Sequence, residues 1–195
     1  MANELAFTAD RQLPTRTFVA EAKKRAEDLD PTIPISIDQK GRAGYGEQFA
    51  YGKFELLGIN QYYGWYTGVE DFSLLDDFLV EIRDHYPTQA IVMTEFGAEG
   101  RPDMANAPAQ DKGSYAFQTN FVDATLDVAE QLPFLSGSIH WTLREFEIYP
   151  GWRGGALPGP GRNTRHHKGV LTYDGKRKPA WQVLRDHFVN TPLYR

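Results

Sequence analysis

The 195-residue sequence has no cysteine, which excludes disulfide bonds and thiol chemistry. It also has no excess of positive charge. The formal net charge is -5 at pH 7, so the composition gives no reason to expect a nucleic-acid partner. No apolar run approaches the length of a membrane span, so no membrane partner is expected. Residues 1–10 lack the basic and apolar stretches of a secretory signal, which favours a cytoplasmic location.

Aromatic residues, in contrast, are abundant at 13% of the chain. Such a surplus suits pockets for flat apolar faces such as sugar rings, although core packing alone could also absorb it. The length is enough for one domain with a sizeable core.

The hydrophobic pattern predicts helices and strands in alternation. Helices are expected over 15–29, 72–86, 114–132 and 179–188, and strands over 33–37, 54–60, 90–95 and 136–142, with glycine-rich loops at 41–46 and 149–165. In the first helix, the apolar face is expected to include Phe18, Val19 and Leu29. Strands that alternate with helices and are apolar throughout indicate a parallel α/β fold.

Polar or aromatic residues stand where these strands end: Asp38, Asn60, Glu95 and Trp141. Parallel α/β folds place their functional sites at the carboxyl ends of the strands. Glu95 is the most informative of the four, because it follows the apolar run 90–93 and precedes Gly97. A buried strand has little use for a glutamate at its end unless the glutamate does chemistry, caps a helix or forms an ion pair.

Glycoside hydrolysis requires two carboxyl groups, and Glu4 is the obvious partner for Glu95. An Asn3-Glu4 pair followed later by Thr94-Glu95-Phe96-Gly97 resembles the retaining glycosidases that are built on a TIM barrel.

Further motifs narrow the resemblance to glycoside hydrolase family 2, the β-galactosidase and β-glucuronidase family. They are, in the family's order, residues 29–34 (LDPTIP), 58–66 (GINQYYGWY), 138–141 (SIHW), 168–174 (KGVLTYD) and 178–180 (KPA). The resemblance covers nearly the whole chain.

The resemblance implies an α/β fold of the TIM (β/α)8 type, here only strands 5–8 with the tip of strand 4. Residues 1–195 would then be the C-terminal half of the catalytic domain, without the upstream β-sandwich domains and strands 1–4. The edges of the predicted sheet would need a partner, either the missing N-terminal half of the barrel or a second copy of the chain. Alone, the chain is expected to hydrolyse aryl β-glycosides poorly.

The resemblance also implies the role of each site residue. Glu4 would be the general acid/base, Glu95 the nucleophile, and Asn3 a ligand of the sugar hydroxyl next to the reacting carbon. Tyr62 would donate a hydrogen bond to Glu95, and Trp141 would be an aromatic platform for the sugar.

Lys168 would reach a substituent of the sugar. In β-glucuronidases an asparagine two residues before this lysine helps to bind the sugar carboxylate, whereas this chain has His166 there. A protonated histidine can assist a carboxylate, but a neutral sugar such as galactose is equally compatible.

The resemblance thus predicts a retaining exo-β-glycosidase, of β-galactosidase or β-glucuronidase type, that acts on a carbohydrate substrate. The alternatives are an endo-acting glycoside hydrolase of the same clan and a non-catalytic carbohydrate-binding remnant. No cofactor is expected. A metal site at His166 and His167, with His140 or Glu145, is not expected either, because adjacent histidines point apart and no zinc-type ligand spacing appears.

Overall fold

The computed structural model describes residues 2–5, 13–40, 51–66, 72–150 and 164–191. The predicted loop at 41–46 and most of the loop at 149–165 lie outside these residues. The chain divides into two compact units. Unit 1 consists of Met1–Gln61, Ser73–Glu95 and Leu132–Ile139, and unit 2 of Tyr62–Phe72, Phe96–Gln131 and His140–Arg195.

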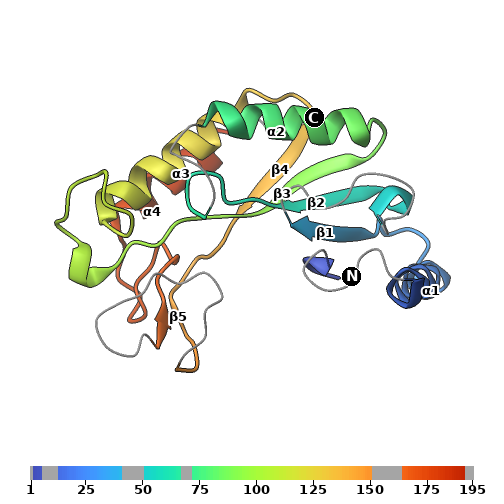
Figure 1. The fold of residues 1–195 in the computed structure, drawn as a ribbon, viewed down its shortest axis with the longest axis horizontal. Helices are drawn as coiled ribbons and strands as arrows, with labels where there is room; N and C mark the ends of the chain where they lie inside the picture. The colour runs from blue at the N-terminus through green and yellow to red at the C-terminus, as the bar shows by residue number, and fades with distance from the viewer. Residues whose placement is uncertain (1, 6–12, 41–50, 67–71, 151–163, 192–195) are drawn as a thin grey trace. The chain divides into compact units, whose positions relative to one another are not determined.

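The centre of unit 1 is a four-stranded sheet (Figure 1). Its strands are β1 (Ser36–Lys40), β2 (Leu56–Asn60), β3 (Ala90–Phe96) and β4 (Leu135–His140), and they lie side by side in that order. The pairs β1–β2 and β2–β3 are parallel. Strands that are neighbours both in sequence and in space, joined by crossovers, are the expected result of alternating strands and helices. The prediction of a parallel α/β fold is therefore confirmed.

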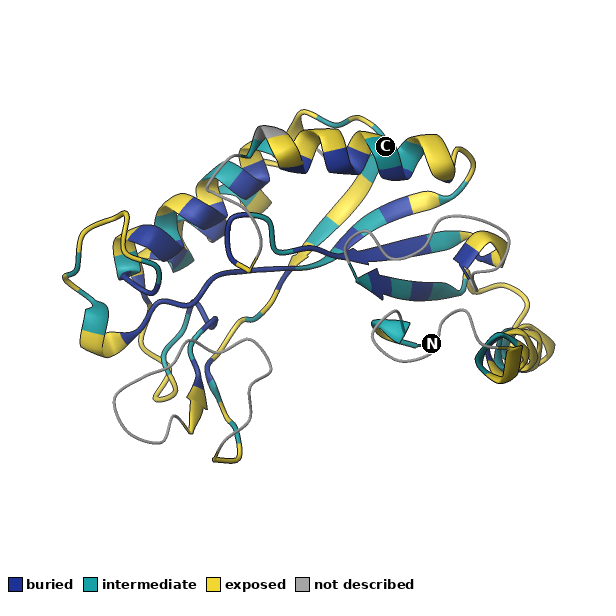
Figure 2. Ribbon diagram, viewed as in Figure 1, coloured by how far each residue is buried: buried dark blue, intermediate teal, exposed yellow. Residues whose placement is uncertain are grey.

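Two helices belong to unit 1, α1 (Leu13–Leu29) and α2 (Ser73–His85), and a short 3-10 turn, η2 (Tyr51–Lys53), precedes β2. Figure 2 shows buried residues along the side of α2 that is turned toward the sheet. These fully buried residues of α2 are Leu75, Phe78, Leu79 and Ile82. Their spacing of three and four residues is the amphipathic pattern that predicts this helix.

The apolar face predicted for α1 is wrong in part. Val19 is buried, but Phe18 is 63% exposed and Leu29 68% exposed. The helix forms as predicted, but Val19 is the one residue of α1 that is buried. The predicted apolar face of α1 is therefore wider than the part of the helix that packs against the rest of the unit.

Two strand predictions need correction. β1 begins at Ser36 rather than at residue 33, because Pro34 has no N–H to donate to a strand ladder. Half of the residues of β4 are exposed, with Ile139 56% exposed, whereas a strand buried on both faces was expected. The physical reason is its place at the end of the strand order, where one described neighbour covers it.

Unit 2 contains α3 (Tyr115–Glu130) and α4 (Pro179–Asn190), which pack against each other (Figure 1). It also holds the 3-10 turn η3 (Pro102–Met104) and a small antiparallel pair, β5 (Phe146–Glu147) with β6 (Arg165–His166). Ser114 begins α3 by accepting a hydrogen bond from the Phe117 N–H at 2.9 Å. Pro179 begins α4, where its missing N–H costs nothing. Among the described helices, none is both long and apolar enough to cross a membrane.

Candidate active site

The segment that carries Glu4 lies beside β1 in unit 1. Glu4 N donates to the Asp38 carbonyl at 2.9 Å, and Asp38 N donates to the Ala2 carbonyl at 3.0 Å. Asn3 and Asp38 thereby form a parallel bridge at the edge of the sheet. Glu4 is held next to the strand that the sequence predicts as its neighbour.

Asn60, the last residue of β2, connects the polar residues at this edge. Its side-chain Nδ2 donates to Asn3 Oδ1 at 2.7 Å and to Glu4 Oε1 at 3.2 Å. Its Oδ1 accepts a hydrogen bond from Thr94 Oγ1 at 2.8 Å. Asn60 is buried, so these partners satisfy a side chain that would be costly to bury alone. The sequence predicts Asn60 at the end of a strand, but it does not indicate the hydrogen bonds of Asn60 to Asn3 and Glu4.

The backbone of Glu4 has a φ of 52°, in the left-handed region that side chains other than glycine rarely adopt. Such conformations cost on the order of 1–3 kcal/mol and persist where the surroundings determine them. The two backbone hydrogen bonds that join Ala2–Glu4 to Asp38, together with the Asn60 contact, provide those surroundings.

Glu95 is the last residue but one of β3, which ends at Phe96, one residue beyond the predicted end. A shift in the β2–β3 register between Gly58 and Asn60 makes Glu95 the backbone partner of Asn60. Gln61 N then donates to the Glu95 carbonyl at 2.9 Å. Irregularities of this kind re-aim side chains at functional edges of sheets. Asn60 is thus bonded to Glu4 and paired in register with Glu95.

Asp38 is a third carboxyl group at this edge. Burial raises its pKa, and a hydrogen bond with Thr94 works in the opposite direction. Its Oδ1 has no hydrogen-bond partner within the described part of the chain. Gly58 provides the space for it, since a Cβ at Gly58 would lie 1.8 Å from Asp38 Oδ1. The sequence predicts Asp38 at the end of its strand, whereas Asp38 is the middle residue of β1, which continues to Lys40; this packing was not indicated either.

In unit 2, the ammonium group of Lys168 lies among aromatic rings. Its Nζ is 3.6 Å from the ring centroid of Tyr62 and 4.2 Å from that of Tyr66, and it donates a hydrogen bond to the Tyr66 hydroxyl. Lys168 is 1% exposed, which is unusual for a lysine. Cation–π attraction and the hydroxyl offset part of the cost of burying the charge. Of the residues predicted to bind the sugar, Lys168 and Tyr62 are therefore in contact.

His166 and Trp141 both lie against Phe146. The His166 ring stacks on Phe146 with centroids 4.9 Å apart and planes 7° apart, and Trp141 meets Phe146 edge-on at 6.2 Å. Trp141 is 40% exposed, as a platform for a flat ligand must be, whereas His166 is buried. The peptide bond between Trp141 and Thr142 is cis.

Gly97 has no room for a side chain. A Cβ there would lie 2.2 Å from the Trp141 carbonyl oxygen, and the neighbouring Phe96 carbonyl accepts a hydrogen bond from Trp141 N at 2.8 Å. His140 packs edge-on against Phe96, and burial lowers its pKa to about 3, so it is neutral at physiological pH. The glycine that ends the apolar run in the sequence is required by this close backbone contact.

The two histidines considered for a metal site diverge. His166 faces Phe146, while His167 Nδ1 is bonded to Glu145 Oε1 at 2.9 Å. Elsewhere, Asp123, Asp127 and His187 bring three potential ligand atoms within 4.8 Å of one another. His187 is already ion-paired with Asp123, the two carboxylates are exposed, and nothing further indicates an ion there.

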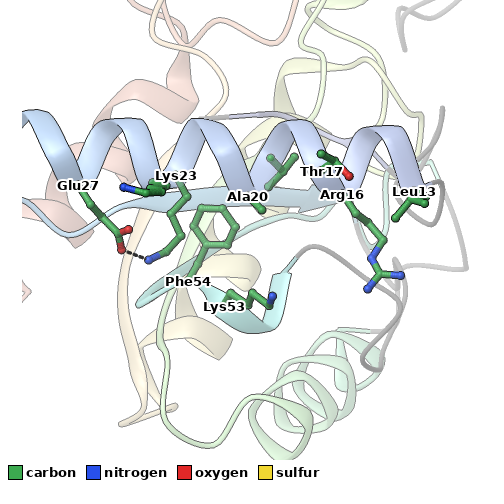
Figure 3. A pocket seen from close by; sticks show the side chains of 10 residues that line it. Leu13, Arg16, Thr17, Ala20, Lys23, Glu27, Lys53 and Phe54 are labelled. Atoms are coloured by element: carbon green, nitrogen blue, oxygen red, sulfur yellow. Dashed lines mark hydrogen bonds and ion pairs between the residues drawn. The ribbon is translucent and has the colours of Figure 1, made fainter.

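A pocket of about 470 Å³ lies between α1 and the segment before β2 (Figure 3). Arg16, Lys23, Lys53 and Phe54 are among the residues that line it, and Figure 3 shows Lys23 paired with Glu27. Two of its lining residues, Lys53 and Phe54, come just before β2 in the sequence, so the pocket lies at the amino-terminal end of this strand. The candidate catalytic residues lie at the other end.

No family model matches the sequence. A curated β-glucuronidase from Streptococcus agalactiae serotype V is 27% identical over 202 residues, which cover 100% of this chain and 31% of that protein.

Two solved structures illustrate the similarity in fold. A GH2 β-galacturonidase from Eisenbergiella tayi, bound to galacturonate, matches with a TM-score of 0.82 and 22% identity over 96% of this chain and 32% of its own. A β-D-glucuronidase for Dictyoglomus thermophilum matches with a TM-score of 0.78 and 22% identity over 99% of this chain and 32% of its own. The chain spans about a third of the length of these proteins.

These structures share the mixed α/β fold of the chain and its parallel sheet. Together with the curated β-glucuronidase, they confirm the resemblance to glycoside hydrolase family 2 that the sequence motifs predict.

Proposed function

We propose that the chain is the C-terminal part of the catalytic domain of a retaining exo-β-glycosidase. Glu4 is its general acid/base and Glu95 its nucleophile. The observation that supports this assignment best is the position of Asn60, which is hydrogen-bonded to Glu4 and paired with Glu95 in the sheet. One buried residue thus contacts the carboxylate of Glu4 and pairs with the backbone of Glu95, which supports the accurate placement that two-carboxylate chemistry requires.

The proposed reaction has two steps. The Glu95 carboxylate attacks the anomeric carbon while protonated Glu4 gives its proton to the departing glycosidic oxygen, and a glycosyl ester on Glu95 forms. Glu4, now ionised, removes a proton from a water molecule, whose oxygen attacks the same carbon and releases Glu95. Two inversions at one carbon give net retention.

Asn3 assists by binding the sugar hydroxyl next to the reacting carbon. Its Oδ1 accepts from Asn60, which orients the Asn3 amide and leaves its Nδ2 group as the donor toward the sugar. The bond to Asn60 therefore supports the proposed role of Asn3.

The proposed substrate is a β-linked uronic acid. Lys168 supplies a buried positive charge for the sugar carboxylate, and His166 stands where the family has an asparagine with the same task. The names of the relatives, β-glucuronidase and β-galacturonidase, agree with a uronide. A β-galactoside is the second candidate, since His166 departs from the family's pattern. Tyr62 and Trp141 keep the roles predicted for them, as hydrogen-bond donor to Glu95 and as sugar platform.

We also propose that the fold is completed as a TIM barrel by a further polypeptide, either an N-terminal half-barrel or a second copy of the chain. Exposed apolar residues support this idea: Phe18 and Leu29 on α1, and Ile139 on β4. The match to about a third of each relative agrees with it.

The experiment is covalent trapping with 2-deoxy-2-fluoro-β-glucuronyl fluoride, followed by peptide mapping by mass spectrometry. Fluoride leaves without acid assistance, so the label requires only the nucleophile and is independent of Glu4. We expect one label, on Glu95, and none in Glu95→Gln, whereas the matched control Glu55→Gln is labelled like the wild type. Labelling of a different carboxylate refutes the assignment. Sugar binding without any label supports a carbohydrate-binding remnant instead.

A further inference from the structure

His167 lies between the two residues proposed to meet the sugar carboxylate, His166 and Lys168. Neighbouring side chains of an extended chain point to opposite sides. His166 stacks on Phe146, and His167 contacts the adjacent residue, Glu145. The direction in which the His167 side chain points therefore determines the opposite direction, in which the side chains of His166 and Lys168 point.

Four hydrogen bonds hold His167 in place. Its N–H donates to Glu99 Oε1 at 3.0 Å, and its Nδ1 donates to Glu145 Oε1 at 2.9 Å. Its carbonyl accepts from Gly100 N at 3.0 Å and from Lys178 Nζ at 2.9 Å. Glu99, Glu145 and Lys178 are all buried. Burying three charged groups is expensive, so this is a costly way to fix one residue of a connecting segment.

The same groups also bind one another. Lys178 Nζ lies 2.6 Å from Glu145 Oε1, and Glu145 Oε2 accepts from Tyr173 N at 2.9 Å. Burial would raise the pKa of Glu145, but the hydrogen bonds from His167 and Lys178 outweigh it and hold that pKa below its ordinary value. Glu145 is therefore ionised at neutral pH and remains an acceptor for His167.

We infer that His167 is a positioning residue that determines how tightly the chain binds uronic acids, through the bond from its Nδ1 to Glu145. The inference rests on the proposed function in so far as His166 and Lys168 bind the sugar carboxylate. Without the Glu145 bond, the three backbone bonds still hold residue 167, but the direction of its side chain is no longer fixed by Glu145, and its two neighbours shift away from the geometry that a carboxylate needs.

The test compares His167→Asn with His167→Gln. The amide nitrogen of asparagine takes the place of Nδ1 and can still donate to Glu145, whereas that of glutamine lies near the place of Nε2 and misses it. The main readout is the dissociation constant of D-glucuronate from nuclear magnetic resonance titration of the full chain, with D-glucose as the neutral comparison. Trapping at Glu95 by a neutral 2-deoxy-2-fluoro-glucosyl fluoride is the second readout.

We expect His167→Asn to bind glucuronate within about 2-fold of the wild type and His167→Gln to bind it about tenfold more weakly, the effect of one hydrogen bond to a charged group. Labelling of Glu95 by the neutral reagent is expected to stay unchanged in both variants. Equal glucuronate affinity in the wild type and His167→Gln overturns the inference, and so does a wild-type chain that binds no uronate. Weaker glucuronate binding in His167→Gln, without labelling of Glu95 in any variant, supports the inference and refutes the proposed nucleophile.

Discussion

Replacing Lys178 by methionine keeps the length of the side chain and removes a buried charge with three acceptors. Its Nζ donates to Glu145 Oε1 at 2.6 Å, to the Gly100 carbonyl at 2.6 Å and to the His167 carbonyl at 2.9 Å. The Glu145 carboxylate then stays buried with one partner fewer. Breaking a buried ion pair from one side costs about 3–5 kcal/mol. Glu145 retains its bonds from His167 and Tyr173, so the lower end, about 3 kcal/mol, is expected.

The assay is thermal unfolding followed by circular dichroism and calorimetry. At about 2–4 °C per kcal/mol for a chain of this size, Lys178→Met should lower the Tm by about 6–12 °C. Lys176→Met is the matched control, because Lys176 pairs with Asp174 at the surface and its loss should change the stability by less than about 0.5 kcal/mol.

A double-mutant cycle with Glu145→Leu tests the cause. If the penalty comes from the carboxylate that loses its partner, the double variant should be more stable than the sum of the two single changes by about 1–3 kcal/mol. A loss below about 1 kcal/mol in Lys178→Met, or strictly additive changes, would refute the reasoning.

Three further predictions concern other parts of the chain. Glu4→Ala should slow the hydrolysis of alkyl β-uronides by about 10²–10⁴-fold and that of dinitrophenyl uronides far less, because a good leaving group needs no proton; equal losses in rate assays would contradict the role of Glu4. Gly58→Ala should cost about 3 kcal/mol or more in urea unfolding, since its Cβ would lie 1.8 Å from Asp38 Oδ1, whereas Gly137→Ala, with nothing within 4 Å, should be close to neutral. Burial lowers the pKa of His187, but carboxylates of α3 outweigh burial and raise that pKa above 6.5. The contribution of the protonated histidine to stability is therefore complete below pH 6.5 and is lost as the pH rises through the raised pKa. His187→Gln should remove this slope, worth at most about 1 kcal/mol, from the pH dependence of urea unfolding.

Much of the fold could be predicted because its signals are local. Periodicity and end signals predict the ends of α2, α3 and α4 to within two residues of those in the structure. β3 was found from its apolar run. The start of β1 and the exposure of Phe18 were missed, because neighbouring elements decide them and the pattern within each segment does not.

The candidate site was predictable to the extent that family motifs carry it. Glu4 and Glu95 were found by motif, and the bridge that places Glu4 beside Asp38 agrees with the predicted order of strands. Asn60 was recognised as a strand-end residue, but its bonds to Asn3 and Glu4 join residues far apart in the chain, and its pairing with Glu95 follows from a register shift; neither has a sequence signature. The bonds of His167 join residues far apart in the chain and were likewise invisible.

The bridge between Ala2–Glu4 and β1 also has a consequence for how activity would fade with temperature. Within the described residues, two backbone hydrogen bonds with Asp38 and two side-chain bonds from Asn60, to Asn3 and to Glu4, hold this segment, whereas Glu95 lies inside a strand of a four-stranded sheet. Segments with few bonds open locally at a small fraction of the free energy of global unfolding. On warming, proton donation by Glu4 should therefore fail first, while Glu95 still reacts with glycosyl fluorides. The chain would pass through a range of temperatures in which it forms a glycosyl ester but cannot cleave an ordinary glycoside.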